Sequence, residues 1–336
     1  MKKILIFNFY DGILKRGIPI YTNNLLELLK KENEVKVIKA PQWILNKPRY
    51  IIDFFFVLYE QIITPIIGLL GGYEKVIYPY NSCSILSSIF GNSLLIIHDF
   101  IPNKKYKEKK SLSALYILFS QYFHELMNRD VAFVSKTTMR LAKNVAAIKG
   151  CDLYYFPNSF YLLDNIIKHD CFDEHDKGKY VFLISGSGEN KEFKKALKLY
   201  KNVSDKVHLK VLGFGNDNKL AKDIISEVDC DNVELLPLIS DHELLKQIYN
   251  SSFVWAHSTA EGFGRPLIEG RMCARPILAT NISAFREHKD QHIYLYNLDN
   301  TSDFLEMFNS ALKDNAEVPF INTYHVDLEK EVSRWL

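Results

Sequence analysis

The chain has 336 residues, and 47% of them are hydrophobic, which is enough apolar material to give two domains a core each. Its 42 basic and 40 acidic residues leave a net charge of +2, so no overall positive field favours nucleic acid as a partner. The five cysteines are scattered and form no CxxC pair, which argues against a disulfide framework or a zinc site and predicts a cytoplasmic location.

The first part of the chain alternates short apolar strands with helical segments, a pattern typical of a parallel, doubly wound α/β sheet. The candidate membrane span is residues 50–72, which include an apolar helical segment over 51–70. Asp53, Glu60, Gln61 and Pro65 interrupt its apolar character, so we expect a buried or interfacial helix instead. The strands expected here cover residues 3–9, 34–39, 75–78, 94–98, 130–134 and 154–156, and a first helix covers about 19–31.

A break at Pro157-Asn158 and a polar, poorly periodic stretch over 164–179 precede a second strand pattern. We therefore expect an N-terminal Rossmann-like domain over 1–160, a second over 161–320, and a terminal helix within 321–336 that can pack back on the first. The second set of strands is expected at 180–185, 209–212, 233–235, 253–256 and 276–279, with helices at 191–201, 219–228, 241–249 and 267–273.

The stretch from Val254 to Glu287 carries two carboxylates at one loop-to-helix junction. Glu261 falls in a glycine-rich turn, and Glu269 falls in the helix that follows. Gly262 and Gly264 let the backbone approach a ligand closely, and the uncapped first turn of the helix offers amides and a positive dipole end to an anion. By spacing alone, a solvated loop acid and a surface helix acid explain the pattern equally well.

Two further motifs follow predicted strands. Residues 185–191 begin at the end of a predicted strand and contain a GxG sequence and then Lys191. The amides of such a turn, together with the lysine, can bind a phosphate, although an ordinary strand-to-helix turn has the same pattern. His98 ends another strand, where an imidazole can exchange a proton with a sugar hydroxyl or merely cap the strand. Because ligands of parallel sheets bind at the carboxyl ends of strands, we expect such loops to line a cleft shared by the two domains.

The segment from Glu261 to Glu269, E-G-F-G-R-P-L-I-E, resembles the E-x7-E motif of the GT4 family of retaining glycosyltransferases. Residues 238–244 and the H-D-x-x-P run at 98–102 are similar to the same family. The chain departs from the family pattern where Arg16 and Pro19 replace glycines, where Ser187 replaces a basic residue and where Arg265 replaces an apolar one.

The resemblance implies a GT-B fold, in which two facing Rossmann-like, doubly wound domains enclose an inter-domain cleft. It places Glu269 at the ribose hydroxyls, Glu261 at the donor sugar and Lys191 at the diphosphate. The role of Arg265 stays open, at the phosphates or turned outward. The residues implied are, as the catalytic pair, His98 and Glu261; for the nucleotide sugar, Ser187, Lys191, Leu238, Gly262, Phe263, Gly264, Arg265 and Glu269; and on the acceptor side, Gly17 and Asp99, with no metal and no cofactor.

The activity implied is transfer of a sugar from a nucleotide-diphosphate sugar to a saccharide hydroxyl, in the assembly of a lipid-linked glycan such as a bacterial surface polysaccharide or O-antigen. The lysine run at 104–110 and the apolar segment 51–70 can meet the anionic inner face of the cytoplasmic membrane. Two alternatives remain: a GT-B epimerase or phosphorylase, and a catalytically silent GT-B subunit that binds a partner or glycan.

Overall fold

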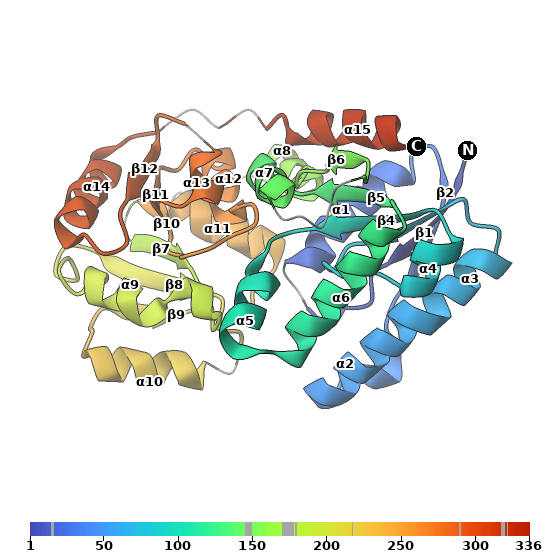
Figure 1. Cartoon of the computed structure of the whole chain (residues 1–336). Coiled ribbons are helices and arrows are strands. Elements are labelled where there is room, and N and C mark those ends of the chain that lie inside the picture. The colour runs from blue at the N-terminus through green and yellow to red at the C-terminus, as the bar shows by residue number, and fades with distance from the viewer. Residues whose placement is uncertain are drawn as a thin grey trace. The chain divides into compact units, whose positions relative to one another are not determined.

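The chain folds into two compact units, Met1–Phe160 with Thr323–Leu336 and Tyr161–Asn322 (Figure 1). The computed structural model describes residues 1–14, 17–144, 150–169, 178, 180–216, 218–288, 290–316, 320 and 322–336, without the side chains of 104–107 and 144. Arg16 and part of the stretch 164–179 therefore lie outside the described residues.

The first unit is built on a six-stranded parallel sheet with the order β2-β1-β3-β4-β5-β6. The strand order reverses between β1 and β3, which pair directly. Its strands are β1 (Lys3–Phe7), β2 (Glu34–Ile38), β3 (Lys75–Tyr78), β4 (Ser93–Ile97), β5 (Asp130–Phe133) and β6 (Leu153–Tyr155). Its helices are α1 (Ile18–Leu29), η1 (Gln42–Ile44), α2 (Arg49–Leu58), η2 (Tyr59–Ile63), α3 (Thr64–Leu70), α4 (Ile85–Phe90), α5 (Ile101–Lys109), α6 (Leu112–Leu126), α7 (Lys136–Asn144) and α15 (Tyr324–Trp335).

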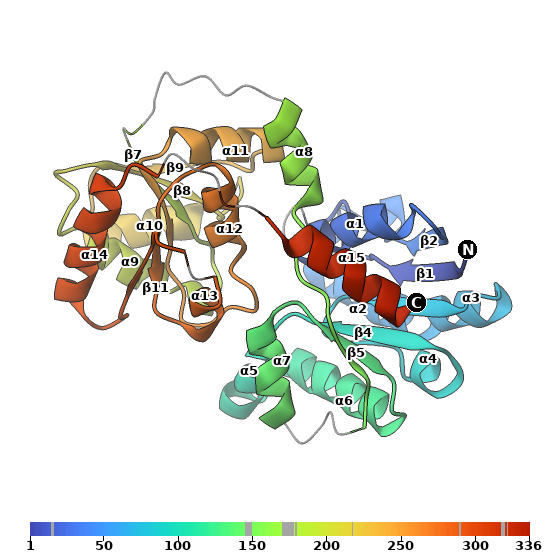
Figure 2. The same ribbon diagram turned by 90° about the horizontal axis from the view of Figure 1, so that it is seen from above.

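Both faces of this sheet are covered by helices. Alternate strand residues such as Leu5 and Val76 lie under α3, where Gly68 permits close contact between helix and sheet. Helix α15 covers the opposite face (Figure 2). There the Trp335 indole donates to Asp130 at 2.9 Å. The C-terminal helix is thus part of the first unit, and it begins at Tyr324.

The segment Arg49–Leu70 is one continuous helix that contains a π-helical turn, η2. By length and composition it is the one helix among the described residues that could cross a membrane, a criterion that core helices also meet. Glu60 in its middle is fully buried and accepts hydrogen bonds from Tyr116 and, at 2.7 Å, from Ser82. These hydrogen bonds of the buried carboxyl group attach the helix to the rest of the first unit.

The burial of Glu60 should make the stability of the protein depend on pH. Burial raises the pKa of its carboxyl group from 4.5 to about 7, so the folded state loses stability as the pH rises through that range. At 1.36 kcal/mol per pKa unit, Glu60→Gln should stabilise the protein by about 3 kcal/mol at pH 8 and by only about 1 kcal/mol at pH 5. Urea denaturation at the two pH values measures this, with exposed Glu27→Gln as the control; an equal effect of Glu60→Gln at both values would refute it.

The second unit contains another six-stranded parallel sheet, with the order β12-β11-β10-β7-β8-β9. Its strands are β7 (Tyr180–Ile184), β8 (His208–Leu212), β9 (Val233–Leu235), β10 (Phe253–Ala256), β11 (Ile277–Thr280) and β12 (Ile293–Tyr296). Its helices are α8 (Tyr161–His169), η4 (Glu189–Lys191), α9 (Phe193–Tyr200), α10 (Lys219–Val228), α11 (Asp241–Asn250), α12 (Arg265–Met272), α13 (Ser283–Arg286) and α14 (Thr301–Lys313).

The core of the second unit divides between the two faces of its sheet. Residues from α9, α10 and α14 pack on one face, around Trp255 and Phe304. Helix α12 packs on the other face, where Gly270 lies against Val254 and Ile277. Two parallel-sheet α/β domains of Rossmann type are therefore confirmed.

The predicted strands all form, with ends shifted by at most two residues. Sequence analysis did not predict β12, nor the helices α4 to α8, α13 and α14. The polar stretch that begins at Asp164 is not irregular throughout, because its first residues continue α8. Two apolar pairs in α8, Leu162-Leu163 and Ile166-Ile167, have the helical spacing that identifies this segment.

Candidate functional site

The predicted donor-site residues of the second unit, except Leu238, lie on or directly after the two loops where its strand order reverses. Strands β7 and β10 pair directly although they are far apart in sequence, so their carboxyl-end loops lie side by side. Such a reversal is where open parallel sheets bind ligands. The loop after β7 leads into η4 with Lys191, and the loop after β10 leads through Glu261 into α12.

A lysine and a glutamate join these two loops. Lys191 Nζ donates to Glu261 Oε1 at 2.6 Å, and the two side chains are 21% and 18% exposed. Both therefore keep a limited opening to solvent. Since an ammonium group has three N–H donors, Lys191 can bind an anion while it keeps Glu261.

Asn190 fixes the relative position of the two loops. Its side-chain amide donates to the carbonyl oxygen of Ala260 at 2.9 Å, and its own carbonyl oxygen accepts from the backbone N–H of Thr259 at 2.7 Å. The Ser258 hydroxyl also donates to that carbonyl, at 3.0 Å. Sequence analysis gave Asn190 no role, although it stands between the GxG turn and Lys191, and it is the residue that holds Lys191 against Glu261.

Glu269 lies one turn into α12 and is buried, with 2% of its side chain exposed. Arg265, four residues earlier, donates to Glu269 Oε1 from Nε at 3.2 Å and from Nη2 at 2.9 Å. Glu261 and Glu269 are therefore not solvated surface acids, which was the alternative that their spacing in the sequence left open. The Nε and Nη2 bonds both go to the same carboxylate oxygen, Oε1.

The turn between the two acids requires glycine at its last position. Gly264 precedes α12 with φ of 94°, and a Cβ there would lie 2.7 Å from the Phe285 ring. Phe263 is buried, its ring centre lies 4.6 Å from that of His288, and its carbonyl oxygen lies 2.5 Å from His288 Nε2. The turn is therefore packed against Phe285 of α13 and His288 of the loop that follows.

Gly264→Ala should destabilise the second unit by about 2–4 kcal/mol, because the substitution adds a steric clash to left-handed backbone strain. Gly215→Ala is the matched control, since Gly215 also has positive φ, 68°, but no atom within 4 Å of the added Cβ. The control should lose only about 1 kcal/mol. Chemical denaturation measures both, and equal losses would show that the Phe285 contact does not constrain the turn.

His257 supports the loop after β10 from inside the core. It is fully buried, its Nδ1 lies 2.5 Å from the Tyr296 hydroxyl, and Tyr296 also accepts from the Trp255 indole at 3.0 Å. Burial, followed by the charges of Lys195 and Lys191, lowers the pKa of His257 to about 4. The ring is neutral at physiological pH and cannot add positive charge to the site.

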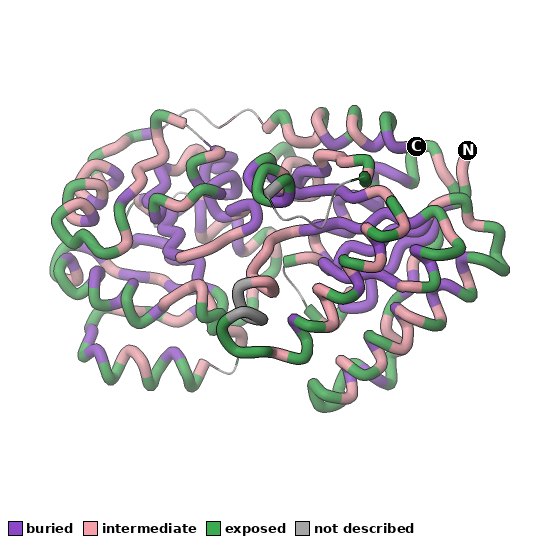
Figure 3. The backbone as a smooth tube through the Cα atoms, in the orientation of Figure 1, coloured by how far each residue is buried: buried purple, intermediate pink, exposed green. Residues whose placement is uncertain are grey.

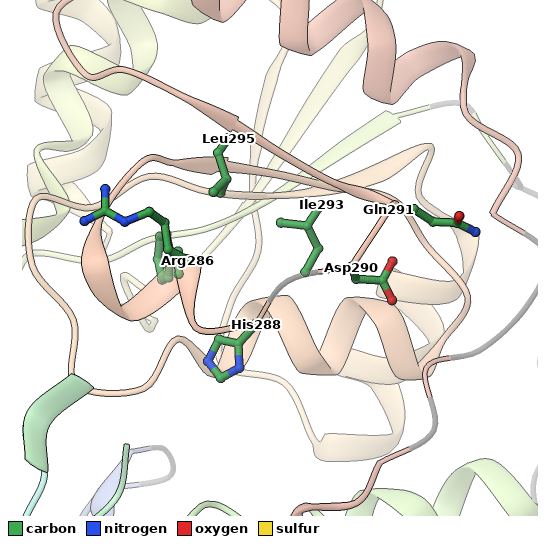
Figure 4. A pocket seen from close by; sticks show the side chains of 7 residues that line it. Arg286, His288, Asp290, Gln291, Ile293 and Leu295 are labelled. Carbon is green, nitrogen blue, oxygen red and sulfur yellow. The ribbon is translucent and has the colours of Figure 1, made fainter. Parts of the chain in front are cut away.

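Two hollows lie near these loops. One, of about 290 Å³, is formed by the GxG turn with Ser187, the start of α9 and Phe214. The other, of about 410 Å³, is formed by α13, β12 and the loop between them (Figure 4). In Figure 4 the Arg286 side chain points away from Asp290 and Gln291, so the polar groups of the larger hollow do not converge.

Of the remaining predicted residues, Leu238 lies on another loop of the second unit, and His98, Asp99 and Gly17 belong to the first unit. Leu238 follows β9, is 37% exposed, and its backbone N–H donates to Asn216 at 3.2 Å. In the first unit His98 follows β4, with its ring centre 4.8 Å from that of Tyr21. Asp99 Oδ1 accepts from the N–H of Ile101 at 2.9 Å and so caps the start of α5.

Gly17 stands immediately before α1 with φ of 77°, and no atom lies within 4 Å of a Cβ built there. The backbone at this position is therefore open to approach. Within the described parts of both units, no three His, Cys, Asp or Glu side chains are grouped as metal ligands.

Comparisons with known proteins agree with this arrangement. Residues 168–324 match the protein family described as Glycosyl transferases group 1. A protein of Methanocaldococcus jannaschii named as an uncharacterized glycosyltransferase is 29% identical over 80 residues, which are 24% of this chain and 23% of that protein. The match thus spans less than a quarter of that relative's length.

Solved structures resemble the whole chain. Sucrose-phosphate synthase from Thermosynechococcus elongatus has a TM-score of 0.68 at 14% identity, over 100% of this chain and 95% of that one. Anabaena HepE in complex with UDP-glucose has a TM-score of 0.66 at 14% identity, over 100% and 96%. At such identities the likeness concerns the fold. The chain therefore has the GT-B fold, and the part of it that matches the Glycosyl transferases group 1 model is slightly less than half of its length.

Proposed function

We propose that this protein is a retaining glycosyltransferase that moves a sugar from a nucleotide-diphosphate sugar to a saccharide hydroxyl. One observation carries the proposal: Lys191 and Glu261 meet at 2.6 Å where the strand order of the second unit reverses, beside the first turn of α12. A cation, a carboxylate and a helix N-terminus at one sheet edge suit a diphosphate ester of a sugar.

In this proposal the second unit holds the donor. Lys191 and the amides of Gly262, Phe263 and Gly264 bind the diphosphate, with Ser187 and Leu238 at the borders of the site. Glu269 accepts hydrogen bonds from the ribose hydroxyls through its carboxylate oxygens, while Arg265 donates to Oε1. Arg265 then has the role of orienting Glu269 instead of binding phosphate itself.

The proposed reaction is a front-face displacement. The bond between the sugar C1 and the phosphate oxygen breaks, the acceptor oxygen bonds to C1 on the same face, and the acceptor proton passes to the departing phosphate oxygen. Lys191 and the amides stabilise the charge that develops on the diphosphate, so the proposal requires no metal. Glu261 acts at the donor sugar, and His98, Asp99 and Gly17 of the first unit act on the acceptor side.

For the acceptor we propose a lipid-linked glycan, as in the assembly of a bacterial surface polysaccharide or O-antigen at the inner face of the cytoplasmic membrane. This part rests on the family resemblance. One structural neighbour, HepE, is a complex with UDP-glucose, so UDP-sugars are the first donors to test.

Calorimetric titration with UDP, GDP, dTDP and CMP, followed by their sugars, tests the proposal. At least one nucleoside diphosphate should bind with one molecule per chain, and its sugar should release nucleotide rapidly only when a saccharide acceptor is added. Rapid conversion of the nucleotide sugar without an acceptor would favour an epimerase. A chain that binds no nucleotide would instead be a silent subunit.

A further inference from the structure

The continuous helix of α2, η2 and α3 presents an apolar stripe to solvent. Apart from Leu70 at its end, the exposed apolar residues of this helix follow at steps of four, three, five, four and three. The five-residue step spans η2, the π-helical turn, which takes up one extra residue. The stripe therefore stays on one side of the helix while Glu60 is buried on the other; its members are Tyr50, Phe54, Val57, Ile62, Ile66 and Leu69.

Two neighbouring helices of the first unit have apolar stripes of their own. On α6 the exposed residues alternate at steps of three and four, and they are Leu112, Leu115, Phe119, Tyr122 and Leu126. On α4 they are Leu86, Ile89 and Phe90. Gln61 in η2 links the three helices, because its side chain bonds to the Tyr116 hydroxyl of α6 at 2.7 Å and to the N–H of Ile85 in α4 at 3.0 Å.

The three stripes form one apolar face. Figures 1 and 3 show α2, α3, α4 and α6 along the same side of the first unit's sheet, with exposed positions along each. On α6 the buried residues Ser120 and His124 lie on the side opposite the stripe. Single exposed apolar residues are ordinary, but a face that extends over three helices marks an interaction surface.

This apolar face carries few charged side chains, and those of opposite sign neutralise each other. Arg49 and Asp53 pair with each other at 2.9 Å, and Glu60 is buried. Immediately before α6 the sequence K-K-Y-K-E-K-K, residues 104–110, holds five lysines and one glutamate. An uncharged aliphatic and aromatic face next to a basic segment is complementary to lipid with anionic headgroups.

We propose that the face formed by α2, α3, α4 and α6 binds the surface of an anionic lipid bilayer. The helix Arg49–Leu70 lies on the membrane instead of crossing it, because the bonds of Glu60 and Gln61 keep its inner side attached to the first unit. Aliphatic and aromatic side chains enter the boundary between headgroups and acyl chains, and the lysine segment contacts lipid phosphates. The inference rests on the membrane location proposed above and specifies its surface, and it can fail without affecting the proposed sugar transfer.

Flotation of the full chain with vesicles tests this without donor or acceptor. Binding should be at least about tenfold stronger to vesicles of phosphatidylcholine with 30% phosphatidylglycerol than to phosphatidylcholine alone, and high salt should weaken it. The triple variant Phe54→Gln, Leu112→Gln, Phe119→Gln replaces side chains that are 64%, 82% and 51% exposed, so it should keep the fold yet bind at least about tenfold more weakly.

A matched control is Leu220→Gln with Val326→Gln, at positions 51% and 62% exposed on other helices, which should bind vesicles as the unchanged chain does. Thermal melting verifies the fold of each variant. Failure to bind either vesicle, or equal binding by the triple variant, would overturn the proposal. If the chain self-associates in light scattering, binds no vesicle, and only the triple variant is monomeric, the face joins two copies of the chain instead.

Discussion

Glu269→Ala is expected to weaken binding of the donor nucleotide about 10- to 100-fold. In our account the buried carboxylate accepts hydrogen bonds from the ribose hydroxyls, and hydrogen bonds to a charged group contribute about 1.5–3 kcal/mol. The substitution also removes the two hydrogen bonds that Arg265 donates to Oε1. Calorimetric titration with the nucleoside diphosphate that the unchanged chain binds measures the loss.

Two further variants make this experiment specific. Glu306→Ala removes an exposed carboxylate from α14 of the same unit, and it should leave affinity unchanged. Glu269→Gln keeps an acceptor oxygen without the charge, and it should bind with intermediate affinity. If Glu269→Ala binds as tightly as Glu306→Ala, while both melt at the temperature of the unchanged chain, Glu269 does not contact the nucleotide.

Glu261→Gln is expected to reduce turnover about 100-fold or more, while the affinity for the donor falls less than about tenfold. Our account places Glu261 at the transferred sugar, where its charge acts on the reacting centre, and removing one such electrostatic contact costs about 2.7–4 kcal/mol in the transition state. Glutamine still offers an oxygen to Lys191 and Asn190, so the loops should keep their positions.

The measurement is the initial rate of nucleotide release at several donor concentrations, with acceptor in excess. A fall in kcat with little change in KM is the expected result, and Glu306→Gln is the control. A rise in KM at constant kcat would instead show that Glu261 serves only donor binding.

Much of the fold could be predicted because alternating apolar strands and helices dictate a parallel sheet, whatever the details of the loops. Strand β12 was missed because the sequence I-Y-L-Y directly follows a charged and polar stretch. The π-helical turn η2 was missed for another reason. Nothing in the composition of Y-E-Q-I-I distinguishes it from an α-helix, and its position depends on burying Glu60 against Ser82 and Tyr116.

The sequence predicted which strand ends carry the residues of the candidate site, but it did not predict the contacts between those residues. Lys191 and Glu261 were each expected at a carboxyl end, yet their direct ion pair follows from the adjacency of β7 and β10, which lie far apart in the chain. The bond from Arg265 to Glu269 has the four-residue helical spacing that favours ion pairs. That spacing is visible in the sequence, and it was the available signal for the role of Arg265.

Hydrogen–deuterium exchange on the chain, with and without the nucleoside diphosphate that titration identifies, tests most directly whether the second unit holds the donor at the ends of β7 and β10. The account predicts slower exchange in peptides that contain residues 186–191 and 262–269, with little change in the larger hollow formed by α13 and β12. Tight nucleotide binding that leaves exchange in both peptides unchanged would contradict it.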